Sequence, residues 1–133
     1  MNTSEKFEYW LDIAEYDLDT AESMLTSGRW VYVVFMCQQA TEKLIKGLYL
    51  LYRDDEGPHI HNINAIISRF ESDLPDPVSE ENKELFRKLT TYYINNRYPD
   101  YMTKLSEQTT EAEAKEMLAK TKGAFIWLLA LRK

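Results

Sequence analysis

One short segment, residues 35–46, limits the possible fold more than any other because it sets long polar side chains inside an apolar helical segment. From residue 31 to residue 52 nearly every other residue is aliphatic, aromatic or a good helix former. Four polar residues follow the spacing i, i+3, i+4 and i+7, which aligns them on one helical face: Gln39, Glu42, Lys43 and Lys46. Burying such groups costs free energy unless they bind one another or a partner. The segment therefore predicts a central helix with a polar face.

Glycines and prolines divide the rest of the chain into helical segments. Apolar residues recur at helical spacing, and no segment alternates as a half-buried strand does. We expect helices at about 4–25, 30–52, 62–70 and 79–93, and a last one opened by the Thr-Glu-Ala-Glu capping box of residues 110–113. Ser79 is the expected N-cap of the fourth helix, and Pro99 should interrupt any continuation of it. The predicted fold is an all-α up-and-down bundle of about five helices, forming one domain over residues 1–133.

Composition and charge argue against several classes of protein. A chain of 133 residues with 44% hydrophobic and 29% charged residues can bury one core, and is typical neither of a disordered chain nor of a membrane protein. The net charge of −6 argues against a surface that binds nucleic acid through phosphate contacts alone. The single cysteine, Cys37, lies in the apolar helix and is expected to be a small core residue. Without a leader, a membrane-spanning run or a cysteine pair, the expected location is the cytoplasm.

Four features, in this order along the chain, resemble the HEPN domain family. They are the segment Ala-Glu-Tyr-Asp-Leu-Asp-Thr-Ala of residues 14–21, the pattern Gln-Gln-Ala-x-Glu-Lys-x-x-Lys of residues 38–46, the pair His61 and Asn62, and Asn-Arg-Tyr-Pro-Asp of residues 96–100. Together they cover most of the chain. The resemblance implies a small helical bundle that commonly dimerises. It also implies one of two kinds of function, since some members are ribonucleases and others bind nucleotides or accompany a nucleotidyltransferase.

The residues around Arg97 bear on the choice between these functions. In the ribonuclease branch of the family that the chain resembles, a helical arginine that holds phosphate is followed, after about four to six residues, by a histidine that moves protons. Residues 98–104 of this chain contain no histidine. Asp100 and Tyr101 ordinarily titrate near pH 4 and about pH 10, far from neutrality. We therefore expect no catalytic residue and a binding module rather than an enzyme.

Two alternatives to a binding module stay open. One is a metal-independent ribonuclease toxin that uses Arg97 with an unconventional proton carrier, and the other is a purely structural dimerisation module. Arg53 and His59 have the ribonuclease spacing, but a Gly-Pro loop separates them, so we do not expect them to be catalytic. We expect no cofactor and no metal, because His59 and His61 have no neighbouring cysteine and only scattered carboxylates.

The tyrosine-rich segment 92–101 is the first part of the predicted binding site. Its tyrosines and Arg97 suit stacking on a base and binding a phosphate, but the tyrosines could equally fill the edge of the bundle while Arg97 pairs with Asp100 or Glu42. The second part is the polar face of the central helix. Six residues make up the predicted nucleotide or partner site: Arg97, Tyr98, Asp100, Lys43, Lys46 and Gln39.

The two lysines of this site differ in their helical neighbours. Lys46 follows Glu42 by four residues and can pair with it, whereas Gln39 takes that place for Lys43. Lys43 is therefore the better candidate for contact with an outside partner. The expected partners are a second copy of the chain, a nucleotidyltransferase in a toxin–antitoxin-like context, and a nucleotide or RNA ligand.

Overall fold

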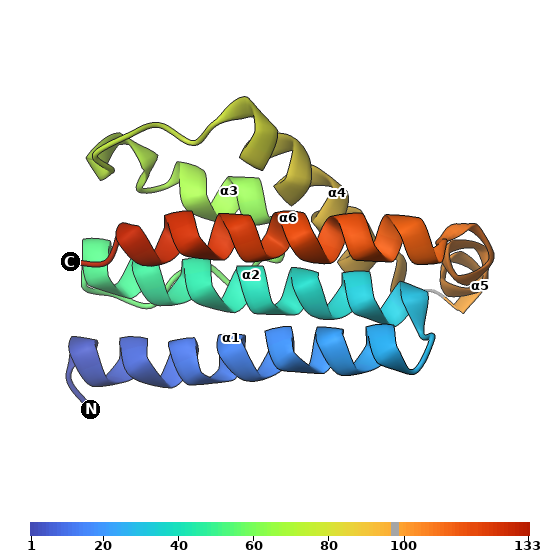
Figure 1. Cartoon of the computed structure of the whole chain (residues 1–133). Coiled ribbons are helices and arrows are strands. Elements are labelled where there is room, and N and C mark those ends of the chain that lie inside the picture. The colour runs from blue at the N-terminus through green and yellow to red at the C-terminus, as the bar shows by residue number, and fades with distance from the viewer. Residues whose placement is uncertain (97–98) are drawn as a thin grey trace.

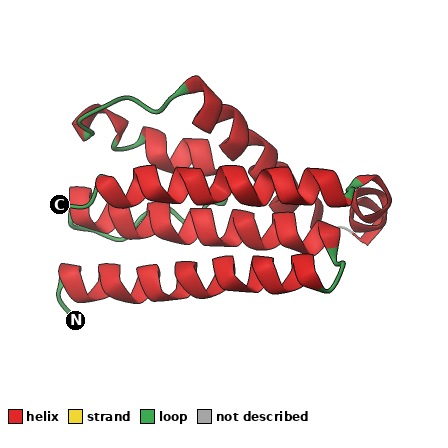
Figure 2. Ribbon diagram, viewed as in Figure 1, coloured by secondary structure: helices red, strands yellow, loops and turns green. Residues whose placement is uncertain are grey.

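The computed structural model describes residues 1–96 and 99–133, and it confirms the all-α fold. Figures 1 and 2 show helices joined by short loops, with no strand in the described ranges. In chain order the elements are α1 (Thr3–Thr26), α2 (Trp30–Arg53), α3 (Ile63–Ser68), the 3-10 turn η1 (Glu71–Asp73), α4 (Glu80–Asn96), α5 (Pro99–Gln108) and α6 (Glu111–Ala130). None of these helices is both long and apolar enough to cross a membrane, as far as the described residues go.

The central position belongs to α2, which contacts each of the other five α-helices. In Figure 1, α1, α2 and α6 run along one another, α3 and α4 lie on the side away from α1, and α5 is seen end-on at the right end of the bundle. The two chain termini lie together at the left end. Since each of these α-helices packs on α2, the side chains on the surface of α2 determine how the other helices are positioned around it.

Thirteen residues of α2 are buried, and the largest fully buried side chains of the molecule gather around this helix. They include Phe7, Leu44, Ile45, Leu48, Ile66, Ile67, Phe70, Phe86, Leu89 and Leu128. Gly47 allows α1 to approach α2 closely, because a Cβ placed there would lie 3.1 Å from the Cβ of Trp10 and 3.2 Å from the ring of Phe7. The close approach brings the start of α1 against the second half of α2.

Polar side chains begin the helices as the sequence predicts. The Ser79 hydroxyl accepts a hydrogen bond from the backbone N–H of Asn82 at 3.1 Å, and the Thr110 hydroxyl accepts one from Glu113 at 3.1 Å. Asn62 caps α3 in the same way through Ala65. These caps confirm the predicted starts of α4 and α6.

The helix α5 was not predicted. Pro99 was expected only to interrupt the preceding helix, whereas it is the first residue of α5, where the missing N–H costs nothing and the fixed φ suits a helix. The bundle consequently has one α-helix more than expected among the described residues. Two ends also differ, since α4 continues to Asn96 and α3 stops at Ser68.

Truncation of a core aromatic should show how much the packing on α2 contributes to stability. We expect Phe86→Ala, at a fully buried position of α4, to lower the free energy of unfolding by about 3–5 kcal/mol. Tyr16→Ala is the matched control, because Tyr16 is 73% exposed on α1 and its loss should hardly change stability. Urea denaturation followed by circular dichroism measures both, and equal losses would contradict the described core.

Candidate functional site

A buried carboxylate lies at the centre of the polar face of α2. Glu42 is only 5% exposed, and it accepts hydrogen bonds from three side chains. The amide of Gln38 donates at 2.8 Å, the ammonium of Lys46 at 3.1 Å, and the Nδ1 of His61 lies 3.0 Å from the same carboxylate. A buried ion costs several kcal/mol unless such partners offset its lost hydration. The predicted pair between Lys46 and Glu42 is therefore confirmed, but it is one part of a larger network.

His61 joins this network from the loop that precedes α3. An ionised carboxylate only accepts hydrogen bonds, so His61 donates from Nδ1, and its Nε2 has no hydrogen bond within the described residues. The His61 ring also stacks on Tyr93 of α4, with ring centroids 4.0 Å apart. Its side chain is 38% exposed. His61 thus carries the network from buried Glu42 to the surface.

Gln39 extends the same network at its other end. Its amide donates to the Gln38 Oε1 at 2.6 Å, and Gln39 itself is half-buried. We call these side chains the Glu42 cluster: Gln38, Gln39, Glu42, Lys46, His61 and Tyr93. The cluster joins α2, α4 and the loop before α3, and it places amide and ammonium donors beside the His61 ring at a partly exposed edge.

Lys43 does not belong to the cluster. Its ammonium lies 2.5 Å from the carboxylate of Asp17, which is buried on α1. Lys43 has no carboxylate partner on α2, as the sequence indicates, but α1 supplies one, and this removes the reason for preferring Lys43 over Lys46 as a contact for an outside partner. Of the four polar residues that the sequence aligns on one face, Lys43 contacts α1, and the other three belong to the Glu42 cluster.

The remaining predicted site residues are at the connection from α4 to α5. Asp100 is exposed in the first turn of α5. Arg97 and Tyr98 lie outside the described residues, so the prediction that they bind a ligand stays a prediction. Tyr93, which stacks on His61, precedes Arg97 by four residues in the sequence.

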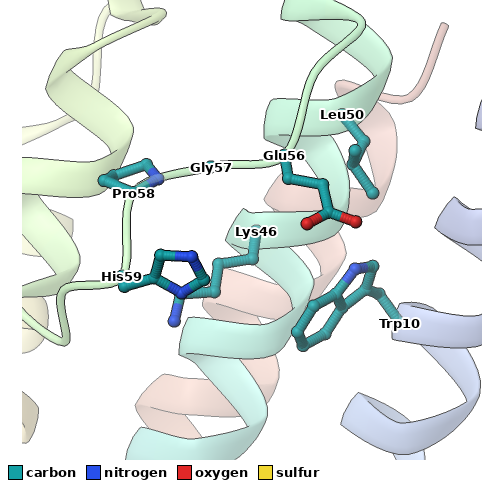
Figure 3. Close-up of a pocket in the computed structure, with 7 residues that line it drawn as sticks. All are labelled: Trp10, Lys46, Leu50, Glu56, Gly57, Pro58 and His59. Atoms are coloured by element: carbon teal, nitrogen blue, oxygen red, sulfur yellow. The ribbon is translucent and has the colours of Figure 1, made fainter.

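A pocket of about 140 Å³ borders Lys46, away from the other predicted site residues. Trp10 of α1 and Leu50 of α2 line it together with the loop residues Glu56, Gly57, Pro58 and His59 (Figure 3). Nothing in the sequence pattern links Trp10 to this loop, since 46 residues separate Trp10 from Glu56. The sequence shows the carboxylate of Glu56 and the imidazole of His59 in one loop, but only the folded structure shows that they lie beside Trp10.

Two other groups have structural roles. Cys37 is fully buried, and burial raises the pKa of its thiol to about 12, with an opposing hydrogen bond from Thr121. A protonated buried thiol is a core residue, as predicted, and not a nucleophile. No group of three potential metal ligands is close enough to hold an ion among the residues that the structure describes.

Removal of the central carboxylate should be costly. We expect Glu42→Ala to destabilise the protein by about 3 kcal/mol, because it leaves the fully buried Gln38 amide and the Lys46 ammonium without their acceptor. Glu84→Ala is the matched control, since Glu84 pairs with Arg87 on the exposed side of α4 and such pairs contribute little. Chemical denaturation of both variants tests this, and equal stabilities would show that the Glu42 cluster does not support the fold.

Comparison with known proteins agrees with this architecture. The chain resembles the crystal structure of TT1696 from Thermus thermophilus, with 28% identity and a TM-score of 0.77 over 98% of each chain. It also resembles the crystal structure of ST0689, an archaeal HEPN homologue, with 26% identity and a TM-score of 0.74 over 94% of this chain and 96% of the other. No curated protein sequence matches it. The family model of the HEPN domain matches residues 7–130, and the chain therefore belongs to the HEPN domain family.

Proposed function

We propose that this HEPN domain is a binding module that takes a nucleotide beside the Glu42 cluster and acts with a nucleotidyltransferase partner in a toxin–antitoxin-like context. The observation that supports this best is the organisation of the cluster around one buried carboxylate. Glu42 holds Lys46 and His61 in fixed positions, and the His61 ring lies flat on Tyr93 at a partly exposed edge. Fixed donors beside an aromatic surface suit a phosphate and a base.

Each group has a separate part in this proposal. Lys46 has two further N–H donors besides the one that it gives to Glu42, and Gln39 keeps a second amide N–H besides the one bonded to Gln38. Arg97 and Tyr98 follow Tyr93 closely in the sequence, and Asp100 lies in the first turn of α5. In the proposed complex Arg97 binds phosphate with its planar fork while the cluster contacts the remainder of the nucleotide.

Calorimetric titration with ATP tests the binding of a nucleotide. We expect Arg97→Ala and Lys46→Met each to weaken binding by about 1.5–3 kcal/mol, the scale of a hydrogen bond to a charged group. Arg87→Ala removes an exposed arginine from α4 outside the cluster and should leave binding unchanged. Melting curves of the three variants separate a loss of binding from a loss of folding. Equal affinities of all variants would contradict the site.

A ribonuclease remains the second candidate, favoured by the contact between His61 and Glu42. A histidine oriented by a carboxylate through Nδ1, with Nε2 free to take a proton, is the usual arrangement of a general base. In this alternative the Nε2 of His61 takes the proton of a ribose 2′-hydroxyl and Arg97 stabilises the phosphate. His61 would then be the proton carrier that the sequence lacks after Arg97.

RNA cleavage separates the two candidates. If the domain is a binding module, protein free of contaminating nuclease leaves single-stranded RNA intact on a gel. Cleavage that is lost in both His61→Ala and Arg97→Ala but retained in His59→Ala would establish the ribonuclease instead. His59 is the appropriate control because it is an exposed histidine of the same loop. It lines the pocket at Trp10 and does not contact Glu42.

We propose further that the domain forms a homodimer through α6. Ile126 is 74% exposed there, and a Cβ added at Gly123 would meet nothing within 4 Å. Gly123 belongs to a surface that includes half-buried Trp127 and adjoins the start of α4. An exposed isoleucine beside an open glycine allows a second helix to approach closely, and the polar residues around them suit the rim of an interface.

Light scattering tests this assembly. We expect wild-type protein to have twice the chain mass of 15.7 kDa and Ile126→Asp to be monomeric, because a carboxylate in the interface would be buried without a partner. Tyr16→Asp places the same charge on the exposed face of α1 and should stay dimeric. A monomeric wild-type protein would exclude the homodimer, and a dimer broken only by Tyr16→Asp would move the interface to α1.

A further inference from the structure

The pocket beside Trp10 shares Lys46 with the Glu42 cluster, but its other lining residues belong neither to that cluster nor to the proposed nucleotide site. Its walls are the Trp10 indole and the Leu50 side chain, and its loop side carries Glu56 and His59. In Figure 3 the Glu56 side chain points from the loop toward Trp10, and the His59 ring overlaps the end of the Lys46 side chain in this view. The pocket therefore combines an aromatic wall with a carboxylate at its rim.

The polar groups at the rim are available to a ligand. Glu56 and His59 form no hydrogen bond or ion pair with any residue of the described ranges, and both are exposed. Lys46 differs, because its ammonium is bonded to Glu42 and its side chain is only 15% exposed. The polar partners that a bound group would meet first are thus a carboxylate and an imidazole.

The charge around the pocket favours a cation. Residues 54–56, Asp-Asp-Glu, place three carboxylates in the loop that borders it. The charge of Lys46 is offset by Glu42, and the other cations nearby are Lys6 and the amino terminus at Met1, which line an adjoining hollow together with Trp10 and Glu56. Within the described residues near the pocket, carboxylates therefore outnumber cations.

The size of the pocket restricts the ligand to one functional group. Pockets for complete small-molecule ligands span roughly 300–1,000 Å³, and this one has about 140 Å³. A planar cation fits the combination of shape and charge, because a guanidinium stacks on an indole face while its N–H groups bind a carboxylate. An ammonium would gain the same charge contact without the stacking.

We propose that the Trp10 pocket binds a guanidinium group, which stacks on Trp10 and donates hydrogen bonds to Glu56. The group belongs either to an arginine side chain of a polypeptide or to a free guanidino compound, which share this chemistry. The proposal does not depend on the nucleotide site, since Trp10 and Glu56, which would bind the guanidinium, are outside the Glu42 cluster.

Titrations monitored by nuclear magnetic resonance test the proposal on the full chain. The indole N–H signal of Trp10 is the readout, assigned by its absence in Trp10→Phe, and the signals of Trp30 and Trp127 are internal controls. The probes are agmatine, a capped Gly-Arg-Gly peptide, and the same peptide with neutral citrulline in place of arginine. We expect a saturable shift of the Trp10 signal with a guanidinium probe and none with the citrulline peptide.

A matched pair of variants then tests the carboxylate. Glu56→Gln should weaken binding about ten- to a hundredfold, because it removes the charge of the acceptor. Glu15→Gln makes the same change at an exposed position of α1 and should leave the affinity unchanged. Binding of both cationic probes assigns the pocket to an arginine side chain, and binding of agmatine alone assigns it to a free guanidino compound. No shift with either cation, equal shifts with citrulline, or an unchanged affinity of Glu56→Gln would overturn the proposal.

Discussion

The buried carboxylate of Glu42 is the constraint on which the arrangement of α2, α3 and α4 depends. An ion in this position needs donors from its surroundings, and α2 itself supplies only Gln38 and Lys46. The third donor, His61, has to come from the loop before α3, which fixes where that loop crosses α2. Tyr93 of α4 then covers the histidine ring. A single acceptor thus sets the relative positions of three elements that apolar packing alone would leave free to slide.

A second polar contact plays the same part on the other side of α2. Lys43 binds Asp17 of α1, although the sequence pattern places it on the same helical face as Gln39 and Lys46. With Gly47 allowing close approach of α1, this ion pair fixes the register of α1 against α2. Lys43 and Glu42 of the central helix therefore each fix the position of a particular neighbouring element, α1 in one case and the loop before α3 in the other.

Much of the fold follows from local sequence, and much of the site does not. Gly28, the Gly-Pro loop after α2 and the caps at Ser79 and Thr110 mark the helices because their effects act within a few residues. The pair of Lys46 with Glu42 was predictable for the same reason, since both lie on one helix. The contact of His61 with Glu42 joins residues 19 apart, and that of Lys43 with Asp17 joins residues 26 apart. Such contacts depend on how the helices pack, and hydrophobic periodicity does not determine that packing. The pocket at Trp10 could not be predicted for the same reason, because it joins α1 to the loop after α2.

The placement of the two chain ends has a consequence for anything joined to this domain. Both termini lie at the left end of the bundle in Figure 1, where α2 also ends and the loop of residues 54–59 begins, while α5 lies at the opposite end. A fused protein or purification tag at either terminus would therefore sit beside the loop and could shield the Trp10 pocket. The same fusion would leave the α5 end open to solvent. A bulky tag should therefore hinder binding at the Trp10 pocket and leave binding near α5 unchanged.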